Sequence, residues 1–227
     1  MKIIITGASG MVGQGVLLEC LDHDGVSEVL SIGRSPLHIE HPKLKQAIHE
    51  DFGDFTKIKN QLIGYDSACL CMGISAAGLK EEEYSKITYD YSLALATTLV
   101  EINPEMTLIY VSGEGTDSSE KGRSMWARVK GKTENALLAL GFKQAFMFRP
   151  GAIIPLRGIK SRTKAYQFMY DYFMWLVRLI KFLAPNSVVN TTQIGTAMIN
   201  ASLYGYEKQV LKPRDILNLS STKAEHE

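Results

Sequence analysis

Short apolar runs alternate with longer segments of helical periodicity along the first 150 residues. The apolar runs predict six strands, at Lys2–Thr6, Val29–Ile32, Ala47–His49, Ser67–Cys71, Thr107–Ser112 and Ala145–Phe148. Helical periodicity lies between them, at Val12–Leu21, Phe55–Ile63, Glu81–Ile102 and Ser124–Leu140. Strands that alternate with helices form right-handed βαβ units. The pattern therefore predicts an α/β fold with a doubly wound parallel sheet of the Rossmann type.

The alternation stops after Arg149-Pro150-Gly151, and a long apolar and aromatic helix is predicted at Tyr166–Leu183. We expect residues 1–150 to form a nucleotide-binding core, and residues 151–227 to form a small C-terminal region on the substrate side of the same structural unit. Charged residues interrupt the helix well before the roughly 20 apolar residues that a membrane span requires. The favoured interpretation is a helix packed over the cleft or in a dimer interface, while contact of residues 166–183 with a membrane surface stays open.

The run TGASGMVG connects the first strand directly to the first helix. Glycines at this position allow a tight turn, a close approach to a pyrophosphate and close packing of the helix on the sheet, while the helix N-terminus directs N–H groups at the phosphates. An ordinary flexible loop is the alternative. The cofactor-binding residues predicted in this turn are Gly7, Ser9, Gly10, Met11, Val12 and Gly13.

The end of the second strand indicates which dinucleotide is bound. A protein that binds NAD usually has a carboxylate there, whereas this chain has Gly33-Arg34-Ser35. Arg34 can pair with a 2′-phosphate, so NADP is predicted and NAD is less favoured, unless Arg34 is only a solvated surface residue. Asp51 and Phe52, after the third strand, suit contacts with the edge and face of adenine, with a helix cap as the alternative role of Asp51.

Composition narrows the possible functions. The 25 basic and 24 acidic residues are interspersed and give a net charge of +1, which does not indicate nucleic-acid binding. The three cysteines have no metal-ligand spacing, the five histidines show no close pairing, and we expect no metal. Cysteines in apolar surroundings, together with an N-terminal strand in place of a signal peptide, predict a protein of the reducing cytoplasm.

Several motifs occur in one order along most of the chain. They are TGASGMVG, Gly33-Arg34, Asp51-Phe52, Cys71-Met72-Gly73, the strand Leu108–Ser112, WARVKGKTE and Arg149-Pro150-Gly151. This order resembles the extended and atypical short-chain dehydrogenase/reductases, which include epimerase-like enzymes, and most of all their small Tat-interacting oxidoreductase-like branch. The resemblance implies further cofactor contacts at Cys71, Met72, Gly73, Lys130, Pro150 and Gly151.

The resemblance also implies catalytic residues, and one of them is replaced. In the family, a Tyr four residues before a Lys acts as acid and base, and the Lys holds the nicotinamide ribose. Here Lys130 is present, but Trp126 occupies the tyrosine position, and an indole N–H can only donate. Lys130 could instead be a solvated residue of a charged helix face.

The family's Ser or Thr after the fifth strand is either Ser112 or Gly113, depending on the alignment. Ser112 could also bond nearby backbone at the strand end. Glu114 is a replacement acid only if its pKa is raised, and an exposed loop glutamate is the alternative. Four tyrosines are less securely placed candidates: Tyr89, Tyr91, Tyr110 and Tyr166.

Two hypotheses follow. The first is an NADP-dependent oxidoreductase or epimerase-like enzyme acting on a small carbonyl or hydroxyl substrate. The second is a catalytically silent NADP-binding protein with a regulatory or interaction role, as the replacement at Trp126 suggests. A homodimer through the helices predicted at Glu81–Ile102 and Ser124–Leu140 is compatible with either.

Overall fold

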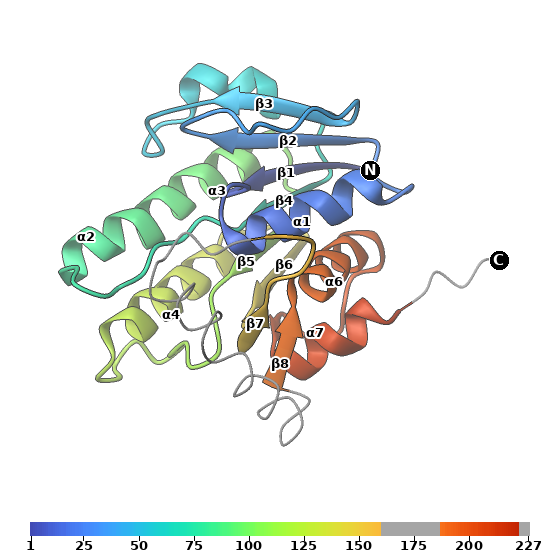
Figure 1. Ribbon diagram of the computed structural model, residues 1–227. Coiled ribbons are helices and arrows are strands. Elements are labelled where there is room, and N and C mark those ends of the chain that lie inside the picture. The colour runs from blue at the N-terminus through green and yellow to red at the C-terminus, as the bar shows by residue number, and fades with distance from the viewer. Residues whose placement is uncertain (160–186, 223–227) are drawn as a thin grey trace.

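Seven parallel strands form the central sheet in the order β3-β2-β1-β4-β5-β6-β9 (Figure 1). The computed structural model describes residues 1–159 and 187–222, so the predicted helix Tyr166–Leu183 lies outside the described residues. The strands are β1 Lys2–Thr6, β2 Glu28–Gly33, β3 Leu44–Ile48, β4 Ser67–Leu70, β5 Thr107–Val111, β6 Gln144–Phe148 and β9 Val210–Leu211. The chain runs outward from β1 to β3 and then continues on the other side of β1 with β4. This is the doubly wound Rossmann arrangement, which confirms the predicted fold class.

The helices between the strands follow the prediction with two differences. Helix α1 spans Met11–Asp22 and α4 spans Met125–Leu138, close to the expected bounds. The segment Thr56–Leu62 is a 3₁₀ helix, η1. The long helix predicted from residue 81 to 102 consists of α2 (Glu81–Ser85), a π-helical turn η2 (Lys86–Asp90) and α3 (Tyr91–Ile102). Side-chain periodicity predicts a helix here, but it does not distinguish these hydrogen-bonding patterns.

The described C-terminal residues complete the sheet and one of its faces. A short parallel pair, β7 (Ala152–Ile154) and β8 (Val188–Asn190), leads into α6 (Thr191–Tyr204), and α7 (Pro213–Ser220) follows β9. Asn190 caps α6, because its side chain accepts a bond of 2.7 Å from the Gln193 N–H. Strand β9 pairs with β6, so the C-terminal region contributes to the central sheet itself.

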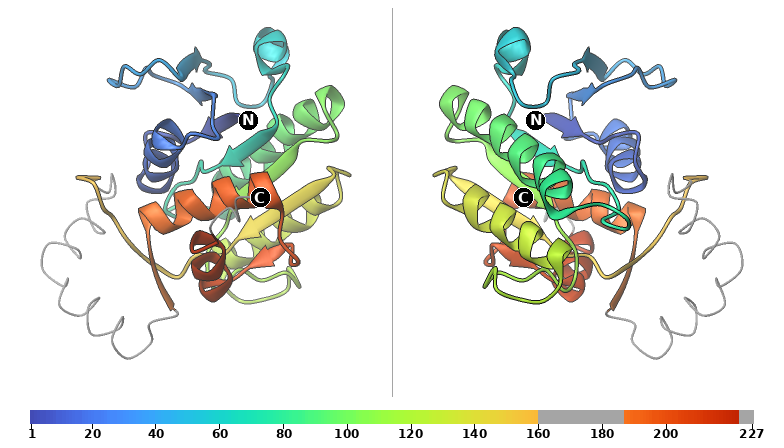
Figure 2. Two further views of the ribbon diagram at one scale, coloured as in Figure 1. Left: turned by 90° about the vertical axis from the view of Figure 1, so that its right-hand side faces the viewer. Right: turned by 90° about the vertical axis from the view of Figure 1, so that its left-hand side faces the viewer.

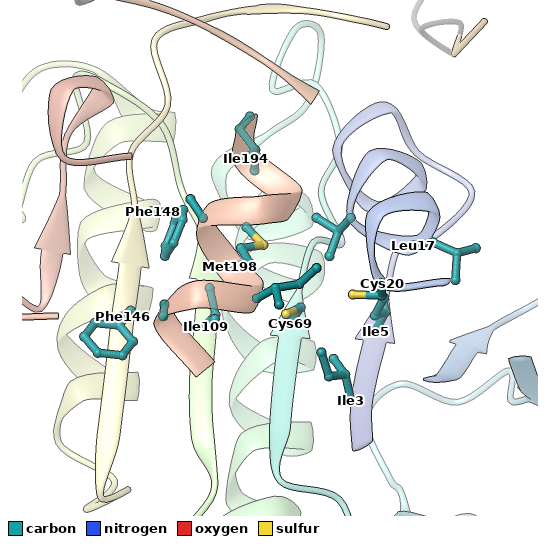
Figure 3. Close-up of a cluster of buried hydrophobic side chains, with 14 of the residues drawn as sticks. Ile3, Ile5, Leu17, Cys20, Cys69, Ile109, Phe146, Phe148, Ile194 and Met198 are labelled. Atoms are coloured by element: carbon teal, nitrogen blue, oxygen red, sulfur yellow. The ribbon is translucent and has the colours of Figure 1, made fainter. Parts of the chain in front are cut away.

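Hydrophobic side chains pack on both faces of the sheet. Helices α1, α6 and α7 cover one face, and η1, α3 and α4 cover the other (Figure 2). On the first face, Met198 of α6 lies near Cys69 and Ile109 of the strands, and Ile194 and Ile3 belong to the same buried cluster (Figure 3). Burial of this apolar surface is the main stabilising contribution to such a fold. Within the described residues, no helix is long and apolar enough to cross a membrane.

Candidate functional site

The carboxyl ends of the central strands lie level along one edge of the sheet. Thr6 at the end of β1 is in register with Ile32 of β2 and with Leu70 of β4. Strands β5 and β6 continue this edge, because Val111 is in register with Phe148. The strand order changes direction between β1 and β4, and ligands of doubly wound sheets bind in the crevice outside such a switch point. The predicted glycine turn and the loop Cys71-Met72-Gly73 therefore lie at this crevice.

Two glycines are required by the backbone of this turn. Gly7 has φ +71°, and a Cβ placed on it would lie 2.7 Å from the carbonyl carbon of Cys71. A Cβ on Gly13 would lie 2.2 Å from the carbonyl oxygen of Gly7. Both distances are too short for any side chain. The chain after β1 thus folds tightly against the end of β4, and α1 starts directly on this turn.

The turn leaves polar groups available for a ligand. Gly10, the N-cap of α1, has no side chain to satisfy the N–H groups of the first helical turn, and this turn contains no acidic residue. Ser9 is exposed and Met11 and Val12 are partly buried at the same helix end. Among the described residues, the buried Thr6 Oγ1 has no hydrogen-bond partner. An uncapped helix N-terminus beside two glycines fits the pyrophosphate of a dinucleotide.

Arg34 follows β2 directly and is exposed at the same edge of the sheet. Its guanidinium makes no ion pair or hydrogen bond to any described residue. A phosphate group on an adenosine ribose could therefore bind Arg34 without displacing a protein partner.

The pair after β3 has mixed surroundings. Asp51 is exposed, and its Oδ1 accepts a bond of 2.9 Å from the Gly53 N–H. Asp51 does not cap a helix, because η1 begins at Thr56 with Phe55 as its N-cap and has no side-chain cap bond. Phe52 is 5% exposed and packs edge-on against Phe55, with ring centroids 5.6 Å apart. Asp51 is thus exposed at the surface, whereas most of Phe52 contributes to the core.

Lys130 lies on α4 at the carboxyl end of β5. Its Nζ donates to the carbonyl oxygens of Ser112, at 2.5 Å, and Val111, at 3.3 Å, so it is not a simple solvated lysine. Burial lowers the pKa of its ammonium to about 8, although the negative charge of Glu134 acts in the opposite direction. Trp126, one turn earlier on the same helix, is partly buried and lies against Gly115.

The other predicted catalytic groups have separate environments. Ser112 Oγ donates to Glu134 Oε1 at 2.5 Å and lies 3.2 Å from the Phe148 carbonyl oxygen, so its hydroxyl has protein partners. Glu114 is exposed, with Oε2 beside Gly151. Tyr110 is buried in the sheet, and burial raises the pKa of its phenol. Tyr89 and Tyr91 are partly buried, and Tyr166 lies outside the described residues.

The loop after β6 is packed closely. The carbonyl oxygen of Pro150 accepts a bond of 2.9 Å from the Glu114 N–H. A Cβ on Gly151 would lie 2.4 Å from the carbonyl oxygen of Ser187, so the start of this region contacts the residue before β8. Pro150 and Gly151 thus lie beside the loop that follows β5.

One buried ion pair, between Glu134 and Arg149, was not predicted from the sequence. Glu134 is 1% exposed, and both of its carboxylate oxygens accept from Arg149, with Arg149 Nε 3.0 Å from Oε1. Arg149 Nη2 also donates to Ser118 Oγ at 2.5 Å. The motifs WARVKGKTE and Arg149-Pro150-Gly151 each contain one partner, but sequence alone gives no sign that the two meet.

Two surface hollows lie outside this site. The larger, of about 380 Å³, is lined by residues of the loop after β3 and of α3, and the smaller, of about 120 Å³, lies between α2 and α4. No group of three or more potential metal ligands occurs within residues 1–159 and 187–222.

The strand order and the glycine turn are those of a Rossmann-type α/β fold. No family model matches the chain. Among curated proteins, the rat protein HTATIP2 is 27% identical over 156 residues, which are 67% of this chain and 63% of that protein. The protein fmp52, mitochondrial, of Emericella nidulans is 24% identical over 217 residues, 92% of this chain and 90% of that one. The alignment with the rat protein thus spans less than two thirds of its length.

Solved structures show the same fold at low identity. A UDP-N-acetylglucosamine 4-epimerase from Methanobrevibacter ruminantium M1 superimposes with a TM-score of 0.71 at 16% identity, covering 93% of this chain and 75% of that one. The Bordetella bronchiseptica enzyme WbmF, in complex with NAD⁺, gives a TM-score of 0.68 at 12% identity, with coverage of 97% and 76%. The resemblance to the extended and atypical short-chain dehydrogenase/reductases, and to their Tat-interacting branch, is therefore confirmed.

The relatives correct one prediction. The cysteine pattern and the N-terminal strand suggested a cytoplasmic protein, but related proteins from Emericella, Kluyveromyces and Saccharomyces are named mitochondrial. This finding points away from a purely cytoplasmic location. The prediction was wrong because buried thiols are compatible with any reducing compartment and do not identify which one.

Proposed function

We propose that the chain binds NADP(H) at the turn between β1 and α1 and acts as an oxidoreductase or epimerase-like enzyme on a small carbonyl or hydroxyl substrate. The observation that carries the proposal is the turn itself. Gly7 and Gly13 leave no room for side chains, and the uncapped N-terminus of α1 offers its N–H groups beside them. The chemistry that the cofactor supplies when bound is hydride transfer.

The other predicted cofactor residues are assigned by their place along the same edge of the sheet. Arg34 would pair with a 2′-phosphate, which favours NADP over NAD. Asp51 is exposed and would contact the adenine edge, while Phe52 is only 5% exposed and would add little contact. The Cys71-Met72-Gly73 loop, Lys130 and the Pro150-Gly151 loop would form the nicotinamide end.

Lys130 would orient the nicotinamide ribose through its charged amine. Trp126 cannot accept a proton, and the hydroxyl of Ser112 is already bonded to Glu134. Glu114, exposed beside Gly151, is therefore the candidate acid at this end of the site.

A catalytically silent NADP-binding protein is the second candidate. Two observations favour it: an indole in place of the tyrosine, and a serine whose hydroxyl is occupied by a buried carboxylate. In that case the bound cofactor would stabilise the fold for a regulatory or interaction role.

The test has two stages. Titration calorimetry with NADPH should show binding to the wild-type chain, and absence of binding would refute both candidates. NADPH oxidation is then followed with aldehydes, ketones and quinones for the wild type, Glu114→Gln and Trp126→Tyr. Wild-type turnover that Glu114→Gln abolishes supports the enzyme and its acid. Turnover seen only with Trp126→Tyr supports the silent protein.

A further inference from the structure

The buried pair of Glu134 and Arg149 connects three elements at the carboxyl edge of the sheet. Glu134 lies on α4, Arg149 directly follows β6, and Ser112 directly follows β5. Glu134 Oε1 accepts both from Ser112 Oγ, at 2.5 Å, and from Arg149 Nε, at 3.0 Å. Charge-assisted, bidentate bonds of this kind fix geometry strongly.

Ser112 connects the Glu134–Arg149 pair to Lys130. Ser112 donates its hydroxyl to Glu134 and accepts a bond from Lys130 Nζ at its carbonyl oxygen, at 2.5 Å. Lys130 and Glu134 are four residues apart on α4 and therefore share a helix face. The Glu134 carboxylate thus fixes Ser112, and the carbonyl oxygen of Ser112 binds Lys130. Within the described part of the chain, Lys130 itself forms no ion pair.

A buried ion pair is weak evidence for stability, because desolvation of the two charges offsets much of their attraction. A specific geometric role explains its position better. We propose that Glu134, held by Arg149, is a positioning residue that acts through Ser112 to fix the amine of Lys130 at the carboxyl end of β5. The hydroxyl of Ser112 then serves this arrangement and does not contact substrate.

The carboxylate also has an electrostatic effect on the amine. The groups that face Lys130 are Glu134 from its own helix and the ring of Tyr110 from β5, whose centroid is 5.9 Å from Nζ. Burial lowers the pKa of Lys130, and the charge of Glu134 raises it. Glu134 therefore keeps Lys130 charged up to a higher pH than burial alone would allow.

The first test measures the amine directly and needs no cofactor. In protein carrying ¹³C-labelled lysine, the Lys130 signal is assigned by its loss in Lys130→Met and is followed through a pH titration. Glu134→Gln keeps the side-chain shape and removes the charge, so the pKa of Lys130 should fall by about one unit. Glu101→Gln removes an exposed carboxylate of α3 that pairs with Lys59 of η1, and it should leave the titration unchanged. An unchanged Lys130 titration in folded Glu134→Gln would overturn the proposal.

The second test addresses the contact through Ser112 and leaves no buried charge unpaired. Ser112→Ala should weaken NADPH binding about tenfold, and Ser112→Thr, which keeps the hydroxyl, should restore it. Wild-type affinity in Ser112→Ala would contradict the proposal. Only this part rests on the proposed function: if the wild type binds no NADPH, the function fails, while the Lys130 titration still decides the inference.

Discussion

Arg34 gives the sharpest prediction at the residue scale, because the proposed preference for NADP rests on this residue. The wild type should bind NADPH more tightly than NADH. Arg34→Ala should weaken NADPH binding by roughly tenfold or more and leave NADH binding almost unchanged, because charge-assisted bonds to a phosphate contribute about 1.5–3 kcal/mol. Calorimetric titration with both cofactors measures the difference.

A matched control is Arg123→Ala, which removes another exposed arginine. It should change neither affinity. Equal affinity of the wild type for NADPH and NADH would show that Arg34 is only a solvated surface residue.

Residues of the turn could be predicted from the sequence, whereas those of the buried pair could not. Gly7 and Gly13 belong to a continuous motif whose spacing follows from local backbone geometry. Glu134 and Arg149 are 15 residues apart, on α4 and directly after β6, and meet because α4 packs against β6. Ser112 illustrates the same limit, since its position was predicted but its bond to Glu134 depends on packing.

At the scale of elements, helices α1 and α6 approach each other through glycines. A Cβ on Gly15 would lie 2.7 Å from Thr191 Cβ and 3.1 Å from the Thr191 carbonyl oxygen. Helix propensity alone favours alanine by about 1 kcal/mol, whereas the clash should cost about 1–3 kcal/mol. Gly15→Ala should therefore lower the urea midpoint of unfolding.

Gln14→Ala on the same helix is the control, since it changes propensity without adding an atom at the interface. A higher midpoint in Gly15→Ala than in the wild type would show that α6 can move away from α1 at little cost.

The strands and helices of the first 150 residues follow from hydrophobic periodicity, and the later ones show why that signal is limited. Strand β9 has two residues, and β7 and β8 have three each, which is too short for an alternating pattern. Residues of β9 form a strand because they pair with β6, and their own sequence does not predict it. The sequence pattern does not reveal η2 either, because π-helical bonding leaves the side-chain pattern of a long helix almost unchanged.

Across the whole molecule, most buried groups stabilise the fold, and Lys130 is an exception. The two apolar faces of the sheet provide the favourable burial, while the depressed pKa of Lys130 means that its charged form is disfavoured by folding. A group that opposes stability at the edge where ligands bind is a candidate for function.

The unfavourable contribution of the Lys130 charge to the free energy of unfolding depends on pH in a way that can be measured. The folded pKa of Lys130 is about 8 and lies below the 10.5 of an unperturbed lysine, so between these two values the unfolded chain binds more protons than the folded chain. The contribution of Lys130 to the free energy of unfolding therefore rises with pH across this window. Lys130→Met lacks the contribution, so the wild type should gain stability relative to this variant from pH 8 to pH 10.5. Urea unfolding at several pH values measures the gain, with Lys132→Met as an exposed lysine control on the same helix. A constant difference between wild type and Lys130→Met over this range would show that the folded environment does not disfavour the charge of Lys130.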